Sequence, residues 1–213
     1  MEKELSKEII FEGKIMTITK EEVELEDGNH AFREVLYHHG GVCVLAIVDN
    51  QILLVKQFRY PNRINTLEIP AGKLEKDEDP QTCAFRELEE ETNYRAKDMH
   101  FITKILPSPG YTSEWLYLYE AIDFKEVEDA LSCDEDEFID VIKMDLEEAY
   151  QHVLDGTIFD AKTVIAIMYA YQKRFYKTSK AFLNTHYTKN TNKYSQNCSN
   201  RNITHIMHKK IQT

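Results

Sequence analysis

The chain has 213 residues, enough for one good-sized domain and an appendage. Its 42% hydrophobic and 30% charged residues are ordinary for a globular protein. A net charge of −11 argues against a nucleic-acid-binding protein that works by neutralising phosphates. The first residues lack the apolar stretch of a signal peptide, and no apolar run approaches about 18 residues, so we expect a cytoplasmic protein without membrane contact.

Charge is distributed unevenly along the chain. After Asp160 there are ten Lys and Arg residues and no acidic residue. Removing these ten positive charges from the net charge of −11 leaves −21 on residues 1–160. An acidic domain of this kind needs metal cations and local arginines if it is to bind an anionic substrate.

The N-terminal residues are predicted to form a small antiparallel sheet. Ile9–Phe11 leads to a turn at Gly13-Lys14, and residues 15–19 continue as a strand. Asp27-Gly28-Asn29 is a hairpin signal, after which Phe32–Tyr37 returns as a strand. The edges of so small a sheet usually need to be covered by a partner.

A mixed sheet with helices packed on it is predicted for the rest of the ordered chain. Val42–Val48 is a continuous apolar run, typical of a strand buried on both faces. Further strands are predicted at residues 51–58, 66–69, 102–106, 115–122 and 138–144. One helix is predicted from Leu146 to Gly156, with Ala149, Tyr150, Val153 and Leu154 on its apolar face. Asp160 caps another, with apolar positions at Val164, Ile165, Met168, Tyr169 and Tyr171. The fold class is therefore α/β or α+β.

These patterns divide the chain into three segments. Residues 1–40 form the N-terminal sheet, and residues 41–177 form the main domain. Residues 178–213 are rich in Asn, Thr, Lys and Ser and lack periodicity, which predicts a flexible basic tail. Its histidines His186, His205 and His208 could alternatively be a metal tract, but a dispensable extension is the favoured interpretation.

The central feature is an acidic helix. Asp79 can cap it, Pro80 suits its first position, and Gln81, Ala84, Phe85, Leu88 and Thr92 share the face expected to meet the core. Glu87, Glu90 and Glu91 fall at i, i+3 and i+4 on another face, which we expect on the solvent side. Their mutual repulsion would be relieved by a hard cation such as Mg²⁺ with oxygen ligands. A purely solvated acidic face is the alternative.

The spacing of this region resembles the Nudix box of diphosphate hydrolases. Gly72, five residues, Glu78 and seven residues precede Arg86-Glu87-Leu88-Glu89-Glu90-Glu91. The family's late glycine is Asn93 here, and the following aliphatic residue is Tyr94. Asn tolerates a left-handed helix end, so we expect the helix to stop there.

Three further segments resemble the ADP-ribose pyrophosphatase branch of that family. They are Gln57–Pro61, Glu68–Gly72 and Ser108–Glu114, and the acidic residues 134–137 resemble its late loop. The resemblance spans about residues 10–171. It implies a Nudix-type α/β/α sandwich that hydrolyses ADP-ribose, a nucleoside diphosphate sugar, to AMP and ribose 5-phosphate.

The resemblance also implies roles for individual residues. The metal ligands would be Glu87, Glu90, Glu91 and the Ala71 carbonyl, holding Mg²⁺ or Mn²⁺. Glu78 would orient a water on the metal, and Arg86 would hold the carboxylates, with a plain salt bridge as the alternative.

Proton transfer and substrate contact are assigned in the same way. Glu135 is the predicted base that activates water, and Glu137 is predicted to approach a metal from the other side. Arg59 would contact the diphosphate and Glu68 the ribose or adenine. Arg33 would act from the N-terminal sheet, across a homodimer that the resemblance implies, or would pair with a neighbouring glutamate.

Two other functions stay open. A Nudix hydrolase of another nucleoside diphosphate sugar, or of a dinucleotide polyphosphate, would present the same diphosphate to the same ligands. A non-catalytic module that binds a metal or a protein partner would not need Gly72 and Arg86 at their spacing.

Overall fold

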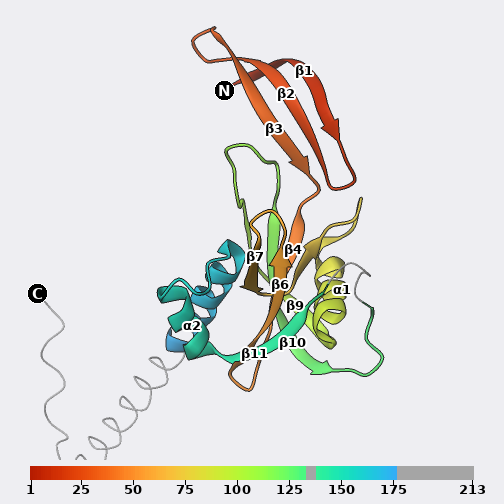
Figure 1. The fold of residues 1–213 in the computed structure, drawn as a ribbon, viewed down its shortest axis with the longest axis vertical. Coiled ribbons are helices and arrows are strands. Elements are labelled where there is room, and N and C mark those ends of the chain that lie inside the picture. The colour runs from red at the N-terminus through yellow and green to blue at the C-terminus, as the bar shows by residue number, and fades with distance from the viewer. Residues whose placement is uncertain (133–137, 177–213) are drawn as a thin grey trace, which may run out of the picture. The chain divides into compact units, whose positions relative to one another are not determined.

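A computed structural model describes residues 1–132 and 138–176 (Figure 1). The chain divides into two compact units, Met1–Tyr169 and Ala170–Thr213. The second unit is described only over residues 170–176. The predicted tail at residues 178–213, with its three histidines, lies outside the described residues.

The predicted N-terminal antiparallel sheet is confirmed. It contains β1 (Lys3–Glu12), β2 (Met16–Glu24) and β3 (His30–His38) in that order. The hairpin between β2 and β3 turns at Gly28, whose φ of 83° favours glycine. The first strand begins earlier than predicted, because its charged residues pair across the sheet with opposite charges on β2, as Lys3 does with Glu24.

The first unit also contains two larger sheets. The first has the order β8-β4-β10-β9, with bounds Ala71–Lys73, Gly41–Leu45, Leu116–Glu126 and Tyr94–Ile105. Strands β4 and β10 are parallel and the other pairs are antiparallel, so the sheet is mixed as predicted. The short strand β8 was not expected from the sequence, where this segment resembles a loop. It forms because its backbone pairs with the fully buried β4.

The second of these sheets places β6 at its centre. Strand β6 pairs with β11, β5 and β7, and the bounds of the four are Gln51–Arg59, Asp140–Asp145, Ile47–Val48 and Ile64–Glu68. The turn between β5 and β6 uses Asp49 and Asn50 at φ values of 49° and 67°. Positive φ at both positions suits a two-residue hairpin between twisted strands.

The acidic helix begins and ends where the sequence predicts. Helix α1 (Pro80–Thr92) has Asp79 as its N-cap, and the Asp79 carboxylate accepts a hydrogen bond from the Thr82 amide at 3.0 Å. Asn93 ends the helix in the left-handed conformation, and its amide donates to the Glu89 carbonyl at 2.9 Å. Leu88 is fully buried in a core that includes Val42, Val44, Leu53 and Tyr119.

The apolar faces of the two later helices are predicted less well. Leu154 in α2 (Leu146–Leu154) is 60% exposed, although it was expected on the buried face. In the helix over residues 161–176, the predicted core residues Ile165 and Met168 are exposed, whereas Lys162 and Thr163 are buried. This helix turns a partly polar face inward because that face pairs with polar groups of residues 68 and 69.

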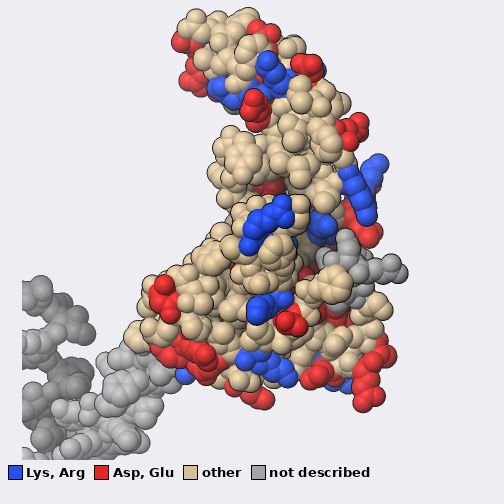
Figure 2. Space-filling model, viewed as in Figure 1, with Lys and Arg blue, Asp and Glu red and all other residues tan. Residues whose placement is uncertain are grey.

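Two surface properties follow from the described residues. None of their helices combines the length and the apolarity that crossing a bilayer requires. On the face drawn in Figure 2, described acidic and basic side chains are interspersed. The absence of nucleic-acid binding stays a prediction.

Candidate active site

The carboxylate of Glu87 lies against the backbone of Gly72. A Cβ at position 72 would lie 1.8 Å from the Glu87 carboxyl carbon, much closer than any real contact. The Glu87 carboxylate can therefore occupy this position only because residue 72 has no side chain. Glu87 is 8% exposed at this position, so the expected solvent-side location of this carboxylate is wrong.

Glu91 is also buried, with 5% of its surface exposed. Its Oε2 accepts a hydrogen bond from the Ala71 amide at 2.9 Å. The third carboxylate, on Glu90, is half-buried. The face that carries these glutamates is covered by β8, a strand absent from the sequence prediction, and this explains why the expected exposure is wrong.

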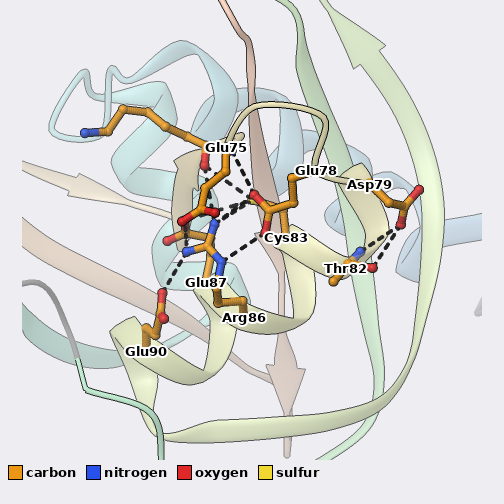
Figure 3. A network of polar contacts seen from close by, with 9 residues as sticks. Glu75, Glu78, Asp79, Thr82, Cys83, Arg86, Glu87 and Glu90 are labelled. Atoms are coloured by element: carbon orange, nitrogen blue, oxygen red, sulfur yellow. Dashed lines mark hydrogen bonds and ion pairs between the residues drawn. The ribbon is translucent and has the colours of Figure 1, made fainter. Parts of the chain in front are cut away.

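Arg86 bonds to Glu78, which precedes α1, and to Glu87 and Glu90 within the helix (Figure 3). Its Nη1 donates to Glu87 Oε1 at 2.7 Å and to Glu90 Oε2 at 2.9 Å. Its Nε and Nη2 donate to the two oxygens of Glu78, each at 3.1 Å. Glu78 is held in turn by the Glu75 amide at 2.9 Å. One guanidinium thus fixes three carboxylates, and its planar fork of donors makes these bonds directional.

The ionisation of this network follows from its contacts. Burial alone would lower the pKa of Arg86, but the hydrogen bonds to Glu78 and the charge of Glu87 outweigh it and raise that pKa. Burial alone would raise the pKa of Glu78, but Arg86 and the Glu75 amide hold it below its ordinary value. Arg86 and Glu78 therefore form a charged pair.

The donor set fits a hard divalent cation. Carboxylate oxygens and a backbone carbonyl are the ligands that Mg²⁺ prefers. The Gly72 backbone provides a cradle that admits a carboxylate and would be filled by any Cβ. Among the described residues, no group of three or more Asp, Glu, His or Cys side chains is arranged as it would be around a bound ion. The guanidinium of Arg86 lies between the carboxylates of Glu87 and Glu90 and bonds to both. The Ala71 carbonyl and the three glutamates would hold the cation.

Arg59 and Glu68, both predicted to contact substrate, are paired with each other. Arg59 Nε donates to Glu68 Oε1 at 2.7 Å, and a second bond joins Nη2 to Oε2. Thr66 and Lys162 also donate to the same carboxylate, which is 2% exposed. Burial alone would raise the pKa of Glu68, but Arg59, Lys162 and Thr66 together lower it to about 2.

The remaining predicted site residues are Arg33, Glu135 and Glu137. Arg33 on β3 pairs with Glu2, through Nε at 3.0 Å, which matches the alternative expectation of pairing with a glutamate. Glu135 and Glu137 lie outside the described residues, so the predicted base and its neighbour stay predictions.

Sequence reasoning missed two polar residues near the site. Lys162 and Thr163 are buried and contact Glu68 and the Ile69 amide. In the sequence they follow the helix cap Asp160, where they resemble ordinary first-turn residues. The burial of Lys162 gives no signal in the sequence, because its partner Glu68 is 94 residues away.

These features define a class of protein. A NUDIX domain model matches residues 37–166, more than half of the chain. The matched region contains the Gly72 cradle, Arg86 and the three glutamates of α1. The chain belongs to the Nudix family.

Three relatives within this family are similar to the chain over most of their length. The chain is 44% identical to the methanol dehydrogenase activator of Bacillus methanolicus, over 79% of this chain and 91% of that protein. It is 43% identical to the ADP-ribose pyrophosphatase of Bacillus subtilis (strain 168), over 84% and 97% of the two chains. A GDP-mannose pyrophosphatase of Yersinia pestis is 32% identical, over 69% and 78%.

A solved structure shares the fold. The crystal structure of an ADP compounds hydrolase superposes with a TM-score of 0.71 at 22% identity, covering 80% of this chain and 92% of that one. This agreement confirms the mixed α/β architecture predicted from the sequence.

Proposed function

We propose that the protein hydrolyses the diphosphate of ADP-ribose to AMP and ribose 5-phosphate, using Mg²⁺ or, alternatively, Mn²⁺. The observation that carries this proposal is the seating of Glu87 against Gly72 and of Glu91 on the Ala71 amide. This arrangement holds the carboxylates of Glu87 and Glu91 at the start of β8, where Ala71 also provides a backbone carbonyl. The relative of Bacillus subtilis, named for this activity and aligned over nearly all its length, supports the choice of substrate.

The chemistry requires positive charge beside an anionic diphosphate. A divalent ion, when bound, supplies charge that offsets the phosphate oxygens and the charge that develops on the leaving group. The chain's own residues hold the geometry: Arg86 fixes Glu87 and Glu90, and the Ala71 amide fixes Glu91. Water forms a bond to one phosphorus as the bridging oxygen bond breaks, and the proposed base Glu135 accepts the water proton.

The proposed substrate contacts include Arg59 and Glu68, the last residues of β6 and β7. The Arg59 side chain is 39% exposed, and Glu68 holds its guanidinium by two hydrogen bonds. A guanidinium that is held in place and partly exposed is suited to bidentate binding of a phosphate. We assign Arg59 to the diphosphate and keep Glu68 as a proposed contact to the ribose or adenine. Arg33 is kept as a proposed substrate contact from the N-terminal sheet, across the dimer.

A homodimer is proposed on the basis of the N-terminal sheet. Its apolar side chains Ile9, Ile10, Phe11 and Phe32 are each more than half exposed. Exposed large apolar side chains on so small a sheet suit an interaction surface. Light scattering after size-exclusion chromatography should give twice the mass of 25.0 kDa. A monomer at micromolar concentration would contradict the proposal.

The substrate proposal is tested with a panel of diphosphates. Initial rates with Mg²⁺ should give a higher kcat/KM for ADP-ribose than for GDP-mannose or diadenosine polyphosphates. The products should be AMP and ribose 5-phosphate. A higher kcat/KM for GDP-mannose would move the proposal to the other nucleoside diphosphate sugars, consistent with the Yersinia pestis relative.

A second candidate function is activation of a methanol dehydrogenase. The Bacillus methanolicus relative that carries this name is 44% identical over 91% of its length. Adding the protein to a purified methanol dehydrogenase tests this candidate. An increase in alcohol oxidation that is lost in Glu91→Gln would support activation through the same site, and an unchanged rate would reject it.

A further inference from the structure

The segment Glu68–Gly72, which precedes α1, is hydrogen-bonded to the helix over residues 161–176. The Ile69 amide donates to Thr163 Oγ1 at 2.9 Å, and Lys162 donates to the Glu68 carboxylate. Both side chains come from the first turn of the helix over residues 161–176. Thr163 is fully buried, and Lys162 is 8% exposed.

Asp160 links these two side chains into one unit. Its Oδ2 accepts from the Thr163 hydroxyl at 2.6 Å and from the Thr163 amide at 3.1 Å, so it also caps the helix. Its Oδ1 lies 3.0 Å from Lys162 Nζ. Lys162 therefore has two acidic partners, Asp160 and Glu68, and a buried ammonium needs such partners to remain charged.

The other end of the same segment contacts the carboxylates of α1. The Pro70 carbonyl accepts from the Val44 amide at 2.8 Å, which fixes the segment on the central strand β4. The next residue, Ala71, donates its amide to Glu91, and Gly72 seats Glu87. Only one residue, Pro70, separates the amide bonded to Thr163 from the amide bonded to Glu91.

We propose that Lys162 and Thr163 are positioning residues for the divalent-metal site. They hold Glu68 and Ile69 so that the Ala71 amide and the Gly72 backbone meet Glu91 and Glu87. This inference rests on the proposed function for the identity of the site. Groups that orient metal ligands in this way typically contribute roughly 10- to 100-fold to metal affinity or activity.

The test uses the full chain and a measurement that does not depend on turnover. Thr163→Val keeps the shape of the side chain and removes the hydroxyl, whereas Thr163→Ser keeps the hydroxyl. Thr103→Val on β9 is the matched control, since the Thr103 hydroxyl makes a long 3.4 Å hydrogen bond to the carbonyl of the adjacent Lys104. Binding of Mn²⁺ is measured by electron paramagnetic resonance of the free ion, and unfolding by thermal melts.

The expected result separates positioning from folding. Thr163→Val should raise the Kd for Mn²⁺ by roughly 10- to 100-fold, and Thr163→Ser and Thr103→Val should stay within about threefold of the unsubstituted chain. Unchanged Mn²⁺ affinity in folded Thr163→Val would overturn the proposal, even if its melting temperature falls. If Thr163→Val does not fold, Lys162→Gln is measured instead: the same rise in Kd supports the proposal, and an unchanged Kd overturns it.

Failure of the proposed function gives a different pattern. A chain that does not hydrolyse ADP-ribose, but loses Mn²⁺ affinity in Thr163→Val, keeps the positioning role and rejects the substrate. A chain that hydrolyses ADP-ribose with unchanged Mn²⁺ affinity in that variant keeps the substrate and rejects the positioning role.

Discussion

Replacing Gly72 by alanine perturbs the site at one defined contact. The new Cβ would lie 1.8 Å from the Glu87 carboxyl carbon and about 2 Å from both of its oxygens. To reach an ordinary contact of 3.4 Å, the carboxylate must move by about 1.6 Å. A misplacement of about 1 Å in a catalytic group can cost roughly 10²-fold in rate. We therefore expect Gly72→Ala to lower kcat/KM for ADP-ribose by at least about 100-fold.

The stability of this variant should change much less than its activity. Residue 72 does not have a positive φ, so alanine can adopt the backbone conformation. Overpacking of this kind costs about 1–3 kcal/mol, measured as the free energy of unfolding in urea. Gly110→Ala is the matched control, because a Cβ there meets no atom within 4 Å. A Gly72→Ala enzyme with more than a third of normal kcat/KM would refute the reasoning.

Three further outcomes are expected. Glu91→Gln should abolish turnover without changing the melting temperature by more than a few degrees, since it is isosteric; a near-normal rate would remove Glu91 as a metal ligand. Arg86→Met should lower the free energy of unfolding by about 3 kcal/mol, because it leaves the half-buried carboxylate of Glu78 and the buried carboxylate of Glu87 without their shared cation. The pKa of Glu68 lies below its ordinary value, at about 2 rather than 4.5. The ionised carboxylate therefore contributes about 3 kcal/mol to the free energy of unfolding. This contribution is complete above pH 4.5 and is lost as the pH falls toward 2. Urea titrations of Glu68→Gln should therefore lack the part of the acid destabilisation that falls in this pH window.

The boundaries of the acidic helix could be predicted because they depend on neighbouring residues. Asp79 and Pro80 define its start, and Asn93 tolerates the left-handed conformation at its end. The apolar run Val42–Val48 likewise predicts the fully buried β4. The prediction of a single strand over this run is wrong, because the structure divides it at Ala46 and Ile47–Val48 forms β5 in the other sheet. Each signal is contained within a few residues of sequence.

The burial of Glu87 and Glu91 could not be predicted in the same way. Helical spacing places them on one side of α1, but the strand that covers this side, β8, is too short and too polar to be recognised. It exists because β4 supplies a pairing edge. The inward face of the helix over residues 161–176 was mispredicted for a related reason, since Lys162 is buried only through its distant partner Glu68.

The location of a divalent ion tests the account most directly. A crystal soaked in Mn²⁺ should show an anomalous difference peak bounded by the carboxylates of Glu87, Glu90 and Glu91 and the Ala71 carbonyl. The same soak of Glu91→Gln should weaken or remove that peak. A soaked crystal with no anomalous peak at these four residues would contradict the central claim that this helix face binds the ion used for hydrolysis.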